Sequence, residues 1–200
     1  MISVLWQKLA RRLARVHERW RASRAARART GLTTRVAHAR TILFVCFGNI
    51  IRSAFAAELL RARCGEPGDL SIRSAGTNAT TDDPAHPTAQ RCAQRFGIDL
   101  SHHRTHRLGE SDLEEADIVL AMELDHIVDI RRRFPEYGDK VYLFTCLTDV
   151  NPRDVSDPVF SPEAAFEACF ERIHRGIRQI VAMRSSRRRS VQSGGADIRK

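Results

Sequence analysis

The chain has 200 residues, of which 42% are hydrophobic and 28% are charged, as in an ordinary globular protein. No apolar run approaches the roughly 18 residues that a membrane-spanning helix needs, and no uninterrupted apolar core follows the first charges as in a secretory signal. The formal net charge of +9 is unevenly spread, because residues 1–40 hold eleven Lys and Arg against one acid and residues 184–200 hold six against one. We therefore expect a basic amphipathic extension over 1–40, a net acidic folded domain over 41–183, and a basic, disordered tail over 184–200.

The extension has an amphipathic pattern. Its apolar residues recur at steps of three and four, which predicts one face of a helix, while Lys and Arg fill the other face: Ile2, Leu5, Trp6, Leu9, Leu13, Val16 and Trp20. This pattern favours binding to an anionic membrane surface or to an acidic partner. The alternatives are a solvated extension, a start codon assigned too far upstream, or a transit peptide. Nucleic-acid binding is not expected, because the acidic domain offers no extended basic face.

From residue 41 the pattern alternates between short apolar runs and amphipathic segments. The sequence predicts strands at 41–45, 70–74, 116–122 and 140–144. It predicts helices at 53–63, 87–97, after residue 122 through Arg133, and 161–183. Such alternation is typical of an α/β fold, here a twisted four-stranded parallel sheet with helices on both faces. Ligands of these sheets bind beyond the carboxyl ends of the strands, and Cys46 stands at one of those ends.

The turn after the first strand reads VCFGNIIRS, residues 45–53. Gly48 and Asn49 tolerate left-handed backbone conformations, so consecutive amides can point inward at a helix N-terminus. The amides of Phe47, Gly48, Asn49, Ile50, Ile51 and Arg52 are the predicted phosphate-binding groups. The guanidinium of Arg52 can hold two further oxygens, and the cation and helix dipole favour a Cys46 thiolate. A thiolate beneath a bound phosphoryl group is a nucleophile in line for its transfer.

Cysteine and histidine spacing bears on metals and on location. The five cysteines are odd in number and widely separated, which argues against a disulfide framework and fits a reducing cytoplasm. His102, His103 and His106 could mimic metal spacing, but no cysteine or paired carboxylates accompany them, so we expect no metal and no other cofactor. The protein is expected to be cytoplasmic, and peripheral at the inner membrane face if its extension binds lipid.

At the turn of residues 45–53 the sequence resembles the low-molecular-weight protein tyrosine phosphatases. The resemblance covers roughly residues 41–182 and rests on the Cys, Gly-Asn and Arg-Ser of the turn together with SAGT (74–77), GIDLSHHRTHRL (97–108), ADIVLAM (116–122) and SDP (156–158). It implies a tyrosine-phosphorylated protein as substrate and hydrolysis of aryl phosphates through a phosphocysteine. Cys46 would then be the nucleophile, with Arg52 as the catalytic cation and Asp157 as the general acid and base.

The resemblance also implies supporting roles. Ser53 would donate a hydrogen bond to the Cys46 sulfur, and Asn49 and His102 would hold the turn in shape, although His102 can equally be a free surface histidine. Phe47, Val159 and Phe160 would form the wall beside a substrate ring. The segment NATTDD, which follows SAGT, contains no aromatic residue to complete that wall.

Two other functions stay open at this point. An arsenate reductase of the same fold would bind arsenate in the same turn, but it would need further cysteines placed to relay oxidation. A non-catalytic phosphate-binding scaffold could dock through its basic arms. The joint presence of Cys46, Arg52, Ser53 and Asp157 favours a phosphatase over both.

Overall fold

The structure is a computed structural model that describes residues 31–64, 70–148 and 154–194. The amphipathic pattern predicted over residues 1–30 therefore lies outside the described residues, as do 195–200 of the tail. The centre of the fold is one sheet with the strand order β2-β1-β3-β4, and all of its strand pairings are parallel. The strands are β1 (Thr41–Cys46), β2 (Ser71–Gly76), β3 (Ile118–Ala121) and β4 (Val141–Leu143). This is the sheet predicted from the alternating pattern, so the expected fold class is confirmed.

The two central strands are apolar throughout because helices cover both of their faces. Every residue of β3 is buried, and so is every residue of β1 after Thr41. The register places Val45 beside Ala75 on one side and Ala121 on the other. Cys46, the last residue of β1, pairs with Gly76 at the end of β2. The carboxyl ends of these strands therefore meet at one edge of the sheet.

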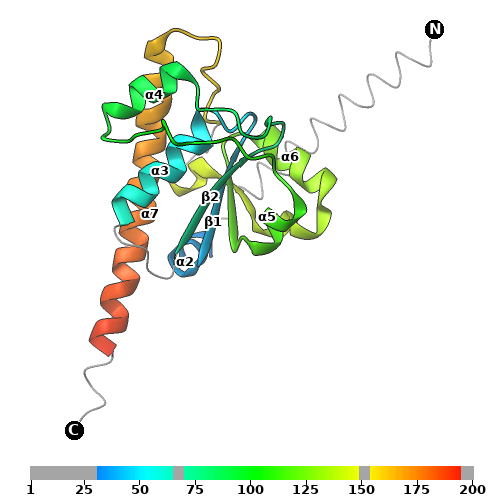
Figure 1. Ribbon diagram of the computed structural model, residues 1–200. Helices are drawn as coiled ribbons and strands as arrows, with labels where there is room; N and C mark the ends of the chain where they lie inside the picture. The colour runs from blue at the N-terminus through cyan, green and yellow to red at the C-terminus, as the bar shows by residue number, and fades with distance from the viewer. Residues whose placement is uncertain (1–30, 65–69, 149–153, 195–200) are drawn as a thin grey trace, which may run out of the picture.

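Figure 1 shows the helices in two groups on either side of the sheet. The first group packs against the long C-terminal helix α7 (Glu163–Gly194) and contains α2 (Leu32–His38), α3 (Arg52–Cys64) and α4 (Pro87–Gln94). The second contains α5 (Glu110–Glu115) and α6 (Leu124–Arg133). Two 3-10 helices, η1 (Pro135–Lys140) and η2 (Phe144–Leu147), flank β4.

Helix α7 closes the core through the apolar face that its sequence predicts. Phe166, Phe170, Ile173 and Ile177 are all buried, and the rings of Phe170 and Phe55 stack with their centroids 3.9 Å apart. Gly176 lies on the same side, where an added Cβ would stand 2.2 Å from the ring of Phe144. Glycine is disfavoured inside a helix, but at this position it is needed because it lets α7 approach η2.

Two helices cross the boundaries expected from the charge pattern. Helix α2 lies within the predicted extension, yet its Leu32 and Val36 are buried against the rest of the fold. Helix α7 continues beyond residue 183, and Arg184 donates hydrogen bonds to the carbonyl oxygens of Val36 and Ala39 at 3.0 and 2.7 Å. The described fold thus includes residues on both sides of the expected domain limits. None of the described helices is both long enough and apolar enough to cross a lipid bilayer.

Candidate active site

The turn between β1 and α3 is shaped by Asn49. Its φ is 57°, in the left-handed region that asparagine tolerates, whereas Gly48 does not adopt a positive φ. The Asn49 amide nitrogen Nδ2 donates to the hydroxyls of Ser53 at 2.8 Å and Ser74 at 3.0 Å. Its Oδ1 accepts a hydrogen bond of 2.9 Å from the amide of His106. Asn49 therefore links the turn to α3, to β2 and to the loop before α5.

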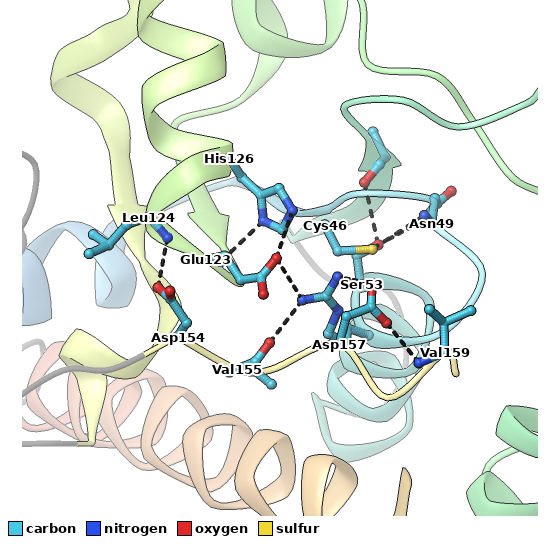
Figure 2. A network of polar contacts seen from close by, with 12 residues as sticks. Cys46, Asn49, Ser53, Glu123, Leu124, His126, Asp154, Val155, Asp157 and Val159 are labelled. Carbon is cyan, nitrogen blue, oxygen red and sulfur yellow. Dashed lines mark hydrogen bonds and ion pairs between the residues drawn. The ribbon is translucent and has the colours of Figure 1, made fainter. Parts of the chain in front are cut away.

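The sulfur of Cys46 lies inside this turn. The Asn49 amide lies 3.2 Å from Sγ and donates to it, and the hydroxyl oxygen of Ser53 lies 3.0 Å from it (Figure 2). The cysteine is only 2% exposed, so these hydrogen bonds act where little water competes. The Asn49 amide is thus a donor to the sulfur, and the Ser53 hydroxyl can be donor or acceptor in its contact.

Gly76, the glycine of SAGT, allows β2 to approach the turn. A Cβ at this position would stand 2.6 Å from the carbonyl oxygen of Phe47 and 3.0 Å from the amide nitrogen of Asn49. Any other residue would push the turn away from the end of β2. The backbone also links the two segments, because Thr77 and Asn78 donate to the carbonyl oxygens of Cys46 and Phe47, each at 2.9 Å.

Arg52 is buried at the start of α3 and is held by three acceptors. Its Nη1 donates to the Val155 carbonyl at 2.8 Å and lies 3.1 Å from a carboxylate oxygen of Glu123, and its Nη2 pairs with Asp157. Burial lowers the pKa of this guanidinium, but the charges of Cys46, Asp157 and Glu123 outweigh it and leave the pKa above its ordinary value. Its Nε is buried and has no hydrogen-bond partner among the described residues.

Glu123 and His126 belong to this network, and the sequence analysis did not single them out. The Nε2 of His126 lies 3.3 Å from Oε2 of Glu123, and its Nδ1 accepts from the Glu123 amide at 3.1 Å (Figure 2). Burial, aided by the charge of Arg52, lowers the pKa of His126 to about 3. Burial also raises the pKa of Glu123, against the opposing effect of Arg52. A signal was present, since Glu123 follows the predicted strand 116–122 at the edge where ligands bind.

His103, rather than His102, contacts the turn. The ring Nε2 of His103 lies 2.7 Å from the carbonyl oxygen of Asn49, with which it shares a hydrogen bond. Burial lowers the pKa of His103, against the opposing effect of that hydrogen bond. His102 is exposed, so the structure does not bring it to the turn and favours the surface alternative for this residue. The resemblance gave His102 the role of holding the turn in shape, whereas the contact with the turn is made by His103.

A cavity of about 430 Å³ opens above Cys46. Its lining brings together nearly all of the predicted phosphate-binding and wall residues with three polar residues of the loop after SAGT: Cys46, Phe47, Gly48, Ile50, Ile51, Arg52, Asn78, Thr80, Asp83, Asp157, Val159 and Phe160. Phe47 is 52% exposed and Phe160 is 99% exposed, so both rings are available to a ligand at the mouth. The amide of Val159 donates to Oδ1 of Asp157 at 3.2 Å, which orients the carboxylate.

One group of potential metal ligands occurs among the described residues, and it lies between α4 and α7. Cys92, Glu163 and Glu167 bring ligand atoms within 4.8 Å of one another. Glu163 pairs with Arg91 at 3.0 Å, and both carboxylates pair with Arg95. Burial raises the pKa of the Cys92 thiol, which disfavours the thiolate that a metal needs. This group is better explained as a contact between two helices.

Fold and site together define an α/β protein with a cysteine at the floor of a cationic turn. The family described as low molecular weight phosphotyrosine protein phosphatase matches residues 41–192. The probable low molecular weight protein-tyrosine-phosphatase EpsP of Ralstonia nicotianae is 38% identical over 138 residues, which span 69% of this chain and 91% of EpsP. The chain therefore belongs to the low molecular weight phosphotyrosine protein phosphatase family, and it is a phosphatase.

Solved structures agree with this assignment and extend the range of similar enzymes. The tyrosine phosphatase Wzb from Escherichia coli K30, in complex with sulphate, matches with a TM-score of 0.67 at 29% identity, over 72% of this chain and 97% of Wzb. The YwlE arginine phosphatase from Geobacillus stearothermophilus matches with a TM-score of 0.66 at 28% identity, over 80% of this chain and 97% of YwlE. The fold is thus shared by phosphatases named for two different substrates.

Proposed function

We propose that the chain hydrolyses phosphotyrosine in proteins, and simpler aryl phosphates, through a phosphocysteine intermediate. The observation that carries this proposal is the position of the Cys46 sulfur, which lies within hydrogen-bonding distance of the Asn49 amide and the Ser53 hydroxyl at the floor of a cavity bordered by Arg52. The buried Nε of Arg52, which has no partner in the described part of the chain, is a donor suited to a phosphate oxygen.

In the first step the Cys46 thiolate attacks phosphorus and the bond from phosphorus to the phenolic oxygen breaks. Arg52 and the amides of residues 47–52 stabilise the charge that builds on the other phosphate oxygens. Asp157 donates its proton to the leaving oxygen, so that tyrosine departs neutral.

In the second step Asp157, now a carboxylate, accepts a proton from water as that water attacks the phosphocysteine. The sulfur–phosphorus bond breaks, inorganic phosphate leaves and the thiolate is restored. Ser53 assists because its hydroxyl, 3.0 Å from the sulfur, can donate to the departing thiolate. The cycle uses no metal and no organic cofactor.

An aryl substrate is favoured by the apolar side chains at the mouth of the cavity. Phe47, Val159 and Phe160 can contact a ring, whereas the opposite side carries Asn78, Thr80 and Asp83. The cavity therefore offers an apolar surface to a substrate ring on one side and polar groups on the other. Because YwlE is named an arginine phosphatase, phosphoarginine is the substrate to compare with phosphotyrosine.

The test compares the wild-type chain with Cys46→Ser on p-nitrophenyl phosphate, a phosphotyrosyl peptide and a phosphoarginyl peptide. We expect the wild type to hydrolyse the two aryl substrates with the higher kcat/KM, and Cys46→Ser to lose about 10³-fold or more in kcat while still binding inorganic phosphate in a calorimeter. Hydrolysis retained by Cys46→Ser would exclude the nucleophile assignment. A higher kcat/KM for phosphoarginine would overturn the substrate assignment and leave the mechanism standing.

The arsenate reductase alternative is disfavoured by the other cysteines. Cys92, Cys146 and Cys169 are buried, and burial raises the pKa of Cys169 to about 12. A thiol of that kind is a poor relay for oxidation at neutral pH. Arsenate reduction by the wild type in the presence of thioredoxin would restore this alternative.

Residues 1–40 are proposed, from their sequence pattern, to bring the phosphatase to an anionic membrane surface or an acidic partner. Removal of residues 1–30 is expected to leave kcat/KM for aryl phosphates unchanged and to weaken sedimentation with vesicles that contain anionic lipid. Equal sedimentation of both chains would contradict the membrane role.

A further inference from the structure

A second hollow, of about 680 Å³, adjoins the candidate active site. It shares Phe47 and Asn78 with the first cavity, so the exposed Phe47 ring borders both. Its remaining lining comes from α6 and from the loops that follow β2 and precede α5: Thr77, Arg107, Glu123, Asp125, His126, Asp129 and Arg133. The proposed mechanism uses only Phe47 of these residues, through its amide and its ring.

The second hollow is close to the reacting sulfur. Arg107 forms a parallel bridge with Gly76, and Gly76 is the partner of Cys46 in the sheet register. Neighbouring strands lie about 4.8 Å apart, so two such steps place the backbone of Arg107 about 10 Å from that of Cys46. An extended peptide advances about 3.3 Å per residue, and three residues span this distance. A substrate with its phosphorylated residue over Cys46 can therefore reach the second hollow with a nearby side chain.

The acidic side chains of this hollow already have partners. Asp129 pairs with Arg132 at 2.8 Å and with Arg133 at 3.1 Å, while Glu123 pairs with Arg52. Asp125 also has an interaction partner. They are therefore not free to bind a basic residue of a substrate.

The basic residues of the hollow differ from one another in their charge and in their partners. Arg133 is held by Asp129 and by the carbonyl oxygens of Thr77 and Leu108, at 3.1 and 3.4 Å. His126 is neutral at physiological pH because its pKa is lowered to about 3, mainly by burial. Arg107 is exposed, and its guanidinium has no ion pair or hydrogen bond to any of the residues that the structure describes. Among the described residues that line the second hollow, Arg107 is thus the arginine whose charge has no acidic partner.

We propose that the second hollow binds an acidic side chain of the substrate protein, with Arg107 donating hydrogen bonds to its carboxylate. The acidic residue lies within three positions of the phosphorylated one, and the Phe47 ring separates the two side chains. This proposal rests on the proposed function, because it names the sequence that the same site selects. It assigns to Arg107 a role in substrate choice and none in the chemical step.

The experiment uses the full chain and phosphotyrosyl peptides with alanine at every flanking position, into which a single Glu is placed at each position from −3 to +3. We expect one position to raise kcat/KM of the wild type about threefold to fivefold at low salt, as for an exposed charge pair. Arg107→Gln should abolish this preference. Arg107→Glu should reverse it, so that Lys at the same position becomes the better residue. p-Nitrophenyl phosphate, which does not reach the second hollow, should be hydrolysed equally by all three proteins.

Arg178→Gln is the matched control, because it removes the same charge from an exposed position of α7 that lines neither cavity. It should keep the wild-type preference. A flat Glu scan in the wild type, or a preference that survives Arg107→Gln, would overturn the proposal. If the wild type does not hydrolyse p-nitrophenyl phosphate, the proposed function itself is wrong.

Discussion

The chain contains the spacing Cys-x5-Arg twice, and the two copies have nothing else in common. Cys46 and Arg52 flank a turn between a strand and a helix, whereas Cys169 and Arg175 both lie within α7. In a helix, residues six apart are rotated by about 240°, so they point to different faces. Cys169 is accordingly buried in the core, and Arg175 is exposed to solvent.

The difference shows that the chemistry depends on the turn and not on the spacing. The left-handed conformation of Asn49 bends the first segment so that an amide and a hydroxyl reach the Cys46 sulfur. Cys169 lies inside α7, where the surrounding backbone amides form the hydrogen bonds of the helix and are not available to stabilise a thiolate. The second copy thus serves as an internal reference for the first.

The largest expected contrast is between the two arginines. Arg52→Lys removes the planar fork that reaches Val155, Glu123 and Asp157 and that is proposed to hold phosphate. We expect kcat/KM for p-nitrophenyl phosphate to fall about 100-fold or more, and Arg175→Lys to change it less than about twofold. Steady-state kinetics on both variants measures the contrast. Similar values for both would remove the distinction between the two copies.

A second contrast concerns Asp157, which forms an ion pair with Arg52 of the first copy. Asp157→Asn should reduce kcat for phenyl phosphate about 100-fold, and should reduce it about tenfold or less for p-nitrophenyl phosphate, whose leaving group needs little protonation. Asp154→Asn is the control, since an amide oxygen can still accept the hydrogen bond from the Leu124 amide. Equal losses on both substrates would exclude Asp157 as the acid.

The two thiols should also differ in their reaction with iodoacetamide at pH 7. Both border a hollow, but burial raises the pKa of Cys169 to about 12, so little of it is thiolate. We expect Cys46 to be alkylated at least about tenfold faster, and inorganic phosphate to slow its reaction but not that of Cys169. Mass spectrometry of the peptides measures both rates. Faster alkylation of Cys169 would contradict the assignment of Cys46 as the reactive thiol.

The smallest expected effect is a pH dependence of stability near the first copy. The pKa of His126 is lowered to about 3 in the fold and returns to about 6.5 on unfolding, so below pH 6.5 the unfolded chain binds the proton more readily. Stability contributed by neutral His126 is therefore present above pH 6.5 and is lost as the pH falls toward 3. Between pH 7 and pH 5, Tm should fall a few degrees more for the wild type than for His126→Gln. Parallel Tm curves would show that His126 does not carry this loss.

The features of this structure that can be predicted from the sequence are those that depend on residues close together in the chain. The strand, the Gly-Asn pair and the cation of VCFGNIIRS predict the turn without any knowledge of the rest of the fold. The position of Glu123 at a strand end was also visible, but its pairing with Arg52 joins residues 71 positions apart and follows only from the sheet order.

Other features could not be predicted because they depend on distant packing. The loop that carries His102 and His103 has no periodicity and is held by isolated bridges to the end of β2 and to the loop that follows it, so neighbouring histidines cannot be told apart from the sequence. Helix α2 lies in an arginine-rich run that looks solvated. It is buried at Leu32 because α7 is long enough to reach it, and the basic residue Arg184 binds backbone carbonyls there.

The attachment of α2 to α7 has a practical consequence. Helix α2 precedes Thr41 and therefore lies at the opposite end of β1 from Cys46, below the sheet in Figure 1. The second half of α7 extends from the same end. An antibody or a solid support that binds α2 or the second half of α7 is thus expected to leave the entrance above the thiol open, so the immobilised protein can still receive a bulky polypeptide.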